Sequence, residues 1–397
     1  MIGCTKLLCG TATVADLLRR GAGREARLLQ FSTARRPIVV WNTTRRCNLA
    51  CAHCYLDAGG DGRGELSTQE GMALVDDVAA MGSPVLLFSG GEPLLRGDLF
   101  ELGRRAVGQG LRAVISSNGT LITRPVAERV REAGFAYVGI SIDGSPPTHD
   151  AFRRKEGAFE AAIRGVRHCL EAGVKAGLRF TLCRRNADDL DAVLDVVERE
   201  GVPRFCMYHL VYAGRGREMR RDDLEPEQTR AAVEHLLDRT RQWHERGVAT
   251  EVLTTDNHAD GVLILRRVAR QEPHRLDDVR ELLRRSGGCS AGTKMANVDA
   301  VGEVHPCQFW SHVSLGNVRE RPLSAIWADE SHPLLARLRR KAEHLTGPRC
   351  GSCVYRHLCG GCRIRAEAVH GDPWADDPAC FLTDPEIAAA PPELAEA

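Results

Sequence analysis

The sequence predicts an α/β protein with six β/α units and a cysteine-rich region towards its C-terminal end. Three observations lead to this prediction. Apolar runs alternate with amphipathic segments between residues 37 and 212, polar residues follow several of these runs, and ten of the 15 cysteines fall into two groups. Continuous apolar runs are typical of parallel strands that are buried on both faces of a sheet. The periodicity alone allows either a barrel or an open doubly wound sheet.

Six strands are expected, with helices between them. The strands are "PIVVWNTT" (37–44), "PVLLFSGG" (84–91), "RAVISSNGT" (112–120), "AYVGISIDG" (136–144), "KAGLRFTLC" (175–183) and "PRFCMYHLVY" (203–212). The helix after the first strand has the clearest start, because Ser67 and Glu70 form a capping-box pattern. The other helices are expected near 98–109, 124–133, 157–172 and 187–200. In such folds the functional site is expected at the C-terminal ends of the strands.

Changes in composition divide the chain into five segments. These are an N-terminal extension (1–36), the β/α core (37–221), a charged helical connector (222–286), the cysteine-rich region (287–385) and a tail (386–397). The cysteine-rich region has too many short glycine-containing segments for a large apolar core. We therefore expect it to need metal in order to fold.

The overall composition excludes several classes of protein. The formal net charge is +1, which argues against a general nucleic-acid binder. No apolar stretch has the length of a membrane span, and the N-terminus lacks the apolar region of a signal peptide. We therefore expect a cytoplasmic protein without a nucleic-acid or membrane partner. In that reducing compartment, clustered cysteines indicate metal or iron–sulfur chemistry.

The first cysteine group is "RRCNLACAHCY", with Cys47, Cys51 and Cys54 spaced as C-x3-C-x2-C directly after the first strand. A structural zinc ion would need a fourth ligand, and His53 is poorly placed to complete a tetrahedron beside Cys54. A 4Fe-4S cluster held by three thiolates instead leaves one iron for an external ligand.

This motif after a first strand resembles the signature of the radical SAM superfamily. The resemblance implies a core that folds as a partial (β/α)6 barrel, and catalytic cysteines that hold a 4Fe-4S cluster. The open iron would bind the amino and carboxylate groups of S-adenosylmethionine. It also implies a low-potential electron donor such as ferredoxin or flavodoxin, and a 5′-deoxyadenosyl radical that takes hydrogen from an unactivated carbon.

Further residues would contact the cofactor by the same resemblance. Tyr55 follows the third cysteine, and "SGGEP" (89–93) resembles the turn that holds the methionyl amino group. The candidate contacts are Tyr55, Gly90, Gly91, Glu92, Asn118, Ser141 and Asp143, with Arg179 as a weaker one. Asn-Gly and Asp-Gly pairs also favour turns, so a purely structural role for Asn118 and Asp143 stays open.

The second cysteine group resembles the SPASM domain, which carries auxiliary 4Fe-4S clusters. Its members are Cys289, Cys307, Cys350, Cys353, Cys359, Cys362 and Cys380. By resemblance, one cluster is held by Cys350, Cys353, Cys359 and Cys380. A second is held by Cys289, Cys307 and Cys362, with an unidentified fourth ligand. The family commonly has three residues between its last two clustered cysteines and this chain has two, so the partition of ligands stays open. Two zinc sites that include His305 or His357 are the alternative.

Several phrases along nearly the whole chain resemble one subfamily, the enzymes that trim side chains of tetrapyrroles in the alternative haem and haem d1 pathways. They are "TKLLCG", "VVWNTTRRCNLACAHCY", "YHLVYAGRG", "HPCQFW", "LGNVRERP" and "GDPWADDPACFL". The resemblance implies removal of acetate side chains from 12,18-didecarboxysiroheme, giving iron-coproporphyrin III. Removal of propionates in haem d1 biosynthesis and decarboxylation of iron-coproporphyrin III are the related alternatives.

A tetrapyrrole with many carboxylates should require arginines beside an apolar opening. The segment after the sixth strand offers such residues, and a solvated basic loop is the alternative. The candidates are Tyr208, His209, Arg215 and Arg217, with Tyr212, Arg220 and Arg221 beside them, and His209 is also a candidate ligand for haem iron. Two other functions stay open: a SPASM enzyme that modifies peptides, and an iron–sulfur electron-transfer protein.

Overall fold

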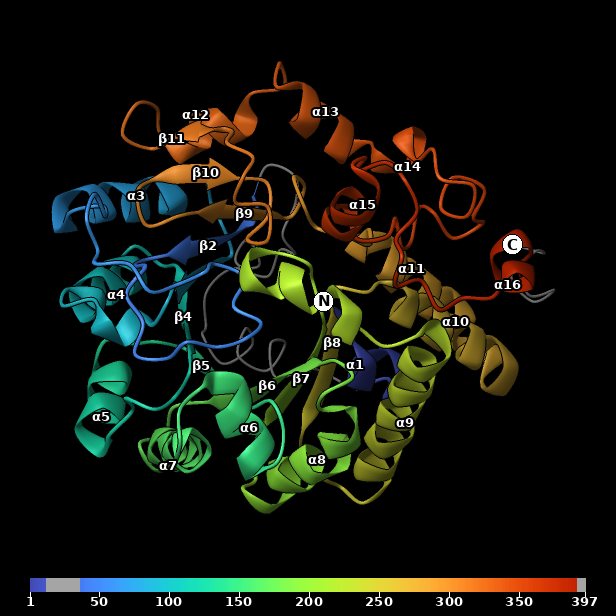
Figure 1. The fold of residues 1–397 in the computed structure, drawn as a ribbon, viewed down its shortest axis with the longest axis horizontal. Coiled ribbons are helices and arrows are strands. Elements are labelled where there is room, and N and C mark those ends of the chain that lie inside the picture. The colour runs from blue at the N-terminus through green and yellow to red at the C-terminus, as the bar shows by residue number, and fades with distance from the viewer. Residues whose placement is uncertain (12–35, 391–397) are drawn as a thin grey trace.

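The computed structural model describes residues 1–11 and 36–390. Its core is one sheet in the order β1-β8-β7-β6-β5-β4-β3-β2-β9-β10-β11. Seven successive strands of this sheet run parallel (Figure 1). They are β2 (Ile38–Asn42), β3 (Val85–Ser89), β4 (Arg112–Ser117), β5 (Tyr137–Ser141), β6 (Ala176–Leu182), β7 (Arg204–His209) and β8 (Glu251–Thr255). The outermost strands do not pair with each other, so the sheet curves without closing, which confirms the expected partial barrel.

Helices cover the outer face of this sheet (Figure 1). They are α3 (Thr68–Ala80), α4 (Leu99–Gly108), α5 (Arg124–Glu132), α6 (Pro146–Arg153), α7 (Ala158–Glu171), α8 (Leu190–Arg199), α9 (Pro226–Glu245), α10 (Ala259–Gln271) and α11 (Leu276–Ser286). The capping box at the start of α3 is confirmed: Glu70 N donates to Ser67 Oγ and Ser67 N donates to the Glu70 carboxylate.

The two faces of the parallel sheet differ in chemistry. Large apolar side chains such as Phe88, Ile115 and Val138 are neighbours across the strands and are fully buried under the helices. Side chains alternate between the faces of a strand, so the inner face carries the residues between them. On that face, Ser141 lies beside Arg179, and Tyr208 lies beside Thr181. The interior of the partial barrel is therefore polar.

The segment expected to be a helical connector also contains a strand. β8 pairs in parallel with β7 and is buried along its whole length. β8 in turn pairs with β1 (Ile2–Gly3), and α1 (Cys4–Cys9) contacts β8 and α9. The expectation of helix alone was wrong for residues 251–255, because a glutamate followed by four apolar or threonine residues between two long helices gives little periodicity to detect. Residues 12–35 of the expected N-terminal extension lie outside the described residues.

The cysteine-rich region continues the same sheet. β9 (Met295–Val298) pairs in parallel with β2, and β10 (Glu303–His305) and β11 (Gly316–Asn317) follow as antiparallel strands. Short helices complete the region: α12 (Leu323–Ala328), α13 (Pro333–Arg339), α14 (Lys341–His344), α15 (Arg363–His370) and α16 (Asp384–Ala388). The expected tail from 386 begins inside α16, where Glu386 forms an ion pair with Arg230. In the described parts of the chain, no helix is long and apolar enough to cross a membrane.

Candidate functional site

The first cysteine group lies on the loop that follows β2. Leu49 N and Ala58 N point at the sulfur atoms of Cys47 and Cys54, each at 3.5 Å. Burial raises the pKa of the Cys47 thiol to about 11. A thiol in such surroundings stays protonated at neutral pH unless a cation binds it, and three neighbouring thiols, two of them with backbone donors, are a suitable donor set for an iron–sulfur cluster.

A buried arginine links this loop to the end of β5. Arg153, the last residue of α6, donates to Cys51 Sγ at 3.3 Å and forms an ion pair with Asp143. Burial raises the pKa of Asp143, but the charge of Arg153, together with His53, His149 and the Thr181 backbone hydrogen bond, holds the pKa below its usual value. His53 Nε2 lies 3.7 Å from the same carboxylate, and burial lowers the pKa of His53 to about 4. Asp143 therefore positions Arg153 against a candidate cluster ligand.

The two glycines of "SGGEP" pack against the cysteine loop itself. A Cβ atom on Gly91 would lie 2.3 Å from Arg46 O, and one on Gly90, which has φ of +139°, would lie 2.6 Å from Thr44 O. Gly91 N donates to Thr44 O at 2.8 Å, and Glu92 N donates to Arg46 O at 2.8 Å. Close backbone packing thus explains both glycines, whereas the sequence analysis gave them only as candidate cofactor contacts in a turn.

Glu92 is fully buried and joins the turn after β3 to the end of β4. Its carboxylate accepts hydrogen bonds from Ser117 Oγ at 2.9 Å, from Asn118 N at 2.9 Å and from Leu94 N at 3.2 Å. Burial raises the pKa of Glu92 to about 7. The Asn118 side chain donates to Asn48 Oδ1 at 2.9 Å, which ties β4 to the cysteine loop as well.

Tyr55 lies at the ends of β2 and β3. Its hydroxyl is 3.0 Å from Asn42 Oδ1 and 3.3 Å from Ser89 Oγ, and its ring meets the Phe309 ring edge-on at 5.2 Å. Ser141 and Arg179 are neighbours on the inner face of the sheet, where Arg179 donates to Ser116 Oγ. The predicted cofactor contacts are therefore spread along one rim of the partial barrel.

The predicted substrate contacts lie in different environments. Tyr208 is on the inner face, but His209 is on the opposite face, 5% exposed, with Nε2 at 2.9 Å from Asp260 Oδ2. Arg215 donates to Cys51 O at 2.8 Å and to Asp57 at 2.7 Å, so it holds the cysteine loop. His209 and Arg215 are thus not available to a substrate as predicted.

Arg217 differs from Arg215, because it is exposed and reaches His312 of the cysteine-rich region at 3.3 Å. Arg220 and Arg221 are exposed on the same short 3-10 segment (Gly214–Asp222). Tyr212 is buried and donates to Asp223 at 2.6 Å. Of the predicted substrate residues, Tyr208 and Arg217 keep positions that a ligand could reach.

The cysteines of the second group separate into the two expected sets. One set lines a single cavity together with Asn257 and Asp377: Cys350, Cys353, Cys359 and Cys380. The other set belongs to one buried cluster with Trp310, against which Tyr55 packs: Cys289, Cys307 and Cys362. Across residues 1–11 and 36–390, no group of three or more Cys, His, Asp or Glu side chains has the arrangement of a single-ion site.

Several known proteins are similar to this chain in sequence. The radical SAM superfamily model matches residues 41–197, and the model of the SPASM iron–sulfur cluster-binding domain matches residues 289–354. Over 98% of its length the chain is 50% identical to Fe-coproporphyrin III synthase of Methanosarcina barkeri (strain Fusaro / DSM 804), covering 99% of that protein. The chain belongs to the radical SAM superfamily. It is therefore an enzyme with 4Fe-4S clusters and S-adenosylmethionine as cofactors.

Other radical SAM proteins are similar over most of the chain. Pre-heme d1 synthase of Dinoroseobacter shibae (strain DSM 16493 / NCIMB 14021 / DFL 12) is 44% identical over 89% of this chain and 88% of that protein. Among solved structures, Streptococcus suis SuiB bound to S-adenosylmethionine has a TM-score of 0.71 at 18% identity, over 88% of this chain and 78% of that one. At that identity the likeness shows the shared fold alone.

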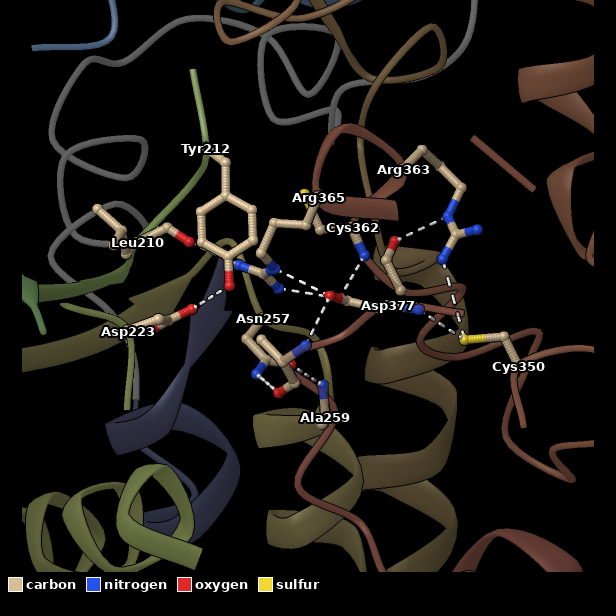
Figure 2. Close-up of polar contacts among 12 residues, drawn as sticks. Leu210, Tyr212, Asp223, Asn257, Ala259, Cys350, Cys362, Arg363, Arg365 and Asp377 are labelled. Carbon is tan, nitrogen blue, oxygen red and sulfur yellow. Dashed lines mark hydrogen bonds and ion pairs between the residues drawn. The ribbon is translucent and has the colours of Figure 1, made fainter. Parts of the chain in front are cut away.

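A buried ion pair connects the two sets of SPASM cysteines. Figure 2 shows Arg365 paired with Asp377, whose side chains are 0% and 1% exposed. The Asp377 carboxylate accepts from Cys362 N at 2.6 Å, while Asp377 N points at Cys350 Sγ at 3.4 Å. Arg365 also donates to Leu210 O, just beyond β7, at 3.1 Å. No sequence motif marked this pair, which ties both cysteine sets to the rim of the radical SAM core.

Proposed function

We propose that this radical SAM enzyme removes acetate side chains from 12,18-didecarboxysiroheme and forms iron-coproporphyrin III, using one S-adenosylmethionine for each side chain. The observation that carries the proposal is the 50% identity to Fe-coproporphyrin III synthase over almost the full length of both chains. The polar inner face with Arg179 and Tyr208, and the exposed Arg217, suit a ligand with several carboxylates.

The second candidate is removal of propionate side chains, as in haem d1 biosynthesis. The observation in its favour is the 44% identity to pre-heme d1 synthase over 89% of the chain. Both candidates share an iron tetrapyrrole substrate, so they differ only in the side chain that the site presents to the radical.

We assign the first cluster, the one that binds S-adenosylmethionine, to Cys47, Cys51 and Cys54, and the auxiliary clusters to the two SPASM cysteine sets. Each set supplies cysteine thiols that can act as ligands to iron. For the domains we propose a radical SAM core (37–221), a connector (222–286) that contributes β8, and a SPASM region (287–385). A low-potential ferredoxin or flavodoxin is the proposed electron donor, and the cytoplasm is the proposed compartment.

Cys47, Cys51 and Cys54 would hold the first cluster, and S-adenosylmethionine bound there would supply radical chemistry for hydrogen abstraction. The protein positions the groups that meet there. Glu92 fixes the ends of β3 and β4, Arg153 orients the Cys51 thiol, and Tyr55 is held between Asn42 and Ser89. Phe309 of the SPASM region packs against the Tyr55 ring at this rim.

The test is anaerobic turnover of the reduced enzyme with 12,18-didecarboxysiroheme, followed by mass spectrometry. Loss of two acetate-derived groups is the expected result. Loss of propionate-derived groups would transfer the assignment to the haem d1 reaction. No mass change, while 5′-deoxyadenosine forms without substrate, would overturn the tetrapyrrole assignment but leave the radical SAM chemistry in place.

A further inference from the structure

The three cysteines of the first group do not receive the same kind of hydrogen bond. Backbone N–H groups point at Cys47 Sγ and Cys54 Sγ, each at 3.5 Å. Cys51 Sγ instead accepts from the guanidinium of Arg153 at 3.3 Å. Hydrogen bonds from a charged donor are roughly twice as strong as those from a neutral one. One of the three candidate cluster ligands therefore meets a full positive charge.

Arg153 is held beside the cysteine loop by its side chain and by its backbone. Its side chain is 8% exposed and forms an ion pair with Asp143, which is 1% exposed. Ala50 N donates to Arg153 O at 3.4 Å, and Ala52 N donates to Phe152 O at 2.8 Å, so the end of α6 lies against the loop. Charged side chains are almost never buried unless they are paired. The Asp143 carboxylate therefore stabilises the guanidinium in this position.

Asp143 is fixed in its turn by the end of β5. Asp143 N donates to His149 Nδ1 at 3.0 Å, and Asn186 Nδ2 donates to Asp143 O at 3.0 Å. Both partners are 1% exposed. Opposite charges interact strongly where water is excluded, so the carboxylate offsets part of the positive charge of Arg153. Two residues thus determine the charge beside the ligand sulfur, and each can be changed separately.

We propose that Arg153 and Asp143 together set the reduction potential of the first cluster, with Arg153 raising it and Asp143 limiting the rise. Reduction adds one electron, supplied by the proposed ferredoxin or flavodoxin, and one negative charge to the cluster. A positive charge bonded to a ligand sulfur favours that reduced state, since net charge and hydrogen bonds to the sulfurs determine the potential. The inference rests on the proposed assignment of Cys47, Cys51 and Cys54. It does not depend on which tetrapyrrole is the substrate.

Arg154, the next residue, offers a matched control. It is exposed, and its φ of +52° ends α6 in the left-handed conformation. Methionine also carries a Cβ atom, so Arg154→Met adds no backbone strain of its own. Arg153→Met and Arg154→Met remove the same charge, one beside a ligand sulfur and one in solvent. Exposed charges are screened far more than buried ones, so the potential should respond only to Arg153→Met.

The test is an anaerobic redox titration of the reconstituted full-length protein, followed by electron paramagnetic resonance. The spectrum of a protein with Cys47, Cys51 and Cys54 all replaced by alanine is subtracted, which leaves the signal of the first cluster. Iron content is measured for every variant. The readout is the ratio of reduced to oxidised first cluster at a fixed solution potential, and it does not depend on turnover.

The variants should shift this ratio in opposite directions. Arg153→Met should lower the ratio at least tenfold, which corresponds to a midpoint potential about 59 mV lower. Asp143→Asn should raise the ratio at least threefold, because Arg153 then acts without its counter-charge. Arg153→Lys keeps the charge and should stay within threefold of the wild type, and Arg154→Met should match the wild type.

Several results would overturn the inference. An unchanged ratio in Arg153→Met would leave Arg153 a structural role only, and shifts of the same sign in Arg153→Met and Asp143→Asn would indicate a disturbed loop rather than an effect of charge. If Arg153→Met binds no iron at the first site, Asp143→Asn decides: a rise supports the inference, and a fall or no change contradicts it. Unchanged iron in the triple-alanine protein would instead remove the first-cluster assignment, which the loss of about four irons per chain supports.

Discussion

Arg215 and Arg217 are two residues apart, yet their surroundings assign them different tasks. Arg215 makes charge-assisted hydrogen bonds to Cys51 O, Asp57 and Ala58 O, which fixes the loop of the first cluster. Arg217 is exposed. Within the described chain, its side chain has a hydrogen bond to His312. The same side-chain type thus stabilises the cofactor loop at one position and is available to a substrate at the other.

Replacing these arginines one at a time should separate the two tasks. Arg215→Ala should lower both first-cluster iron and 5′-deoxyadenosine formation about tenfold or more, since each charge-assisted bond contributes roughly 1.5–3 kcal/mol. Arg217→Ala should leave cofactor cleavage unchanged and weaken tetrapyrrole binding. Iron analysis, 5′-deoxyadenosine assays without substrate and a binding titration measure the three quantities. Normal cofactor cleavage in Arg215→Ala would contradict the role of Arg215 in the loop.

Glu92 should give the stability of the fold a distinct pH dependence. Burial raises its pKa to about 7 in the folded state, whereas the unfolded chain has a carboxyl with a pKa near 4.5. Between these values the folded state binds more protons, so the free energy of unfolding falls as pH rises from 4.5 to 7. The fall should reach about 3 kcal/mol, since one pKa unit corresponds to about 1.4 kcal/mol.

Urea unfolding of the wild type and of Glu92→Gln, compared across this pH range, isolates the contribution. The difference between the two proteins should change with pH in this window and be constant above it. A difference that is independent of pH would mean that Glu92 keeps an ordinary pKa in the folded chain.

At the residue scale, the sequence predicted the groups with a motif and missed those defined by tertiary contacts. Cys47, Cys51 and Cys54 were predicted from their spacing, and Tyr55 from the resemblance to a known motif. Arg153 was not, because its bond to Cys51 connects positions 102 residues apart and its local sequence, "FRRKEG", is an ordinary charged turn.

At the element scale, the turn after β3 shows how tightly neighbouring strand ends are packed. The backbone of residues 90–92 forms two hydrogen bonds with the loop after β2 and leaves no space for a side chain at Gly91. The strand ends of β2, β3 and β4 therefore act as one unit, joined through Glu92 and Asn118.

Gly91→Ala should disrupt this unit, because the new methyl group would lie 2.3 Å from Arg46 O. The expected result is loss of first-cluster iron and of 5′-deoxyadenosine formation. Gly97→Ala is the matched control, since a Cβ atom there meets nothing within 4 Å and its φ is not positive. It should keep the wild-type iron content. Equal behaviour of the two variants would contradict the packing argument.

The elements themselves were predictable to different degrees. All six expected strands and the capped helix α3 are present, because each is long enough to show an apolar run or a capping pattern. The strands β8 and β9 were missed. Each is identified by its pairing with β7 or β2, which no local pattern encodes.

At the scale of the whole molecule, the SPASM region and the radical SAM core share one sheet. β9 covers the edge of β2, the strand that leads into the first cysteine loop, and Ser324 binds Asp77 of α3 at 2.6 Å through its hydroxyl. The Arg365–Asp377 pair adds a further connection to Leu210. The two parts therefore stabilise each other, although each has its own family match.

A chain that ends at residue 286 should consequently fail to fold as an independent core. Truncation removes β9 and leaves the apolar edge of β2 exposed, which favours aggregation. Size-exclusion chromatography and circular dichroism of residues 1–286 should show aggregated or poorly folded protein. A monomeric truncated chain that still cleaves S-adenosylmethionine would contradict the shared-sheet argument.

The order of strands in this sheet also determines when each strand can meet its partner during synthesis on the ribosome. β2 is synthesised early, but its partner β9 lies about 250 residues later in the chain. The separation between β1 and its partner β8 is also about 250 residues. At typical translation rates this delay is roughly 10 to 50 s. During that time the cysteine loop after β2 has no neighbour on one side, so insertion of the first cluster can precede completion of the sheet.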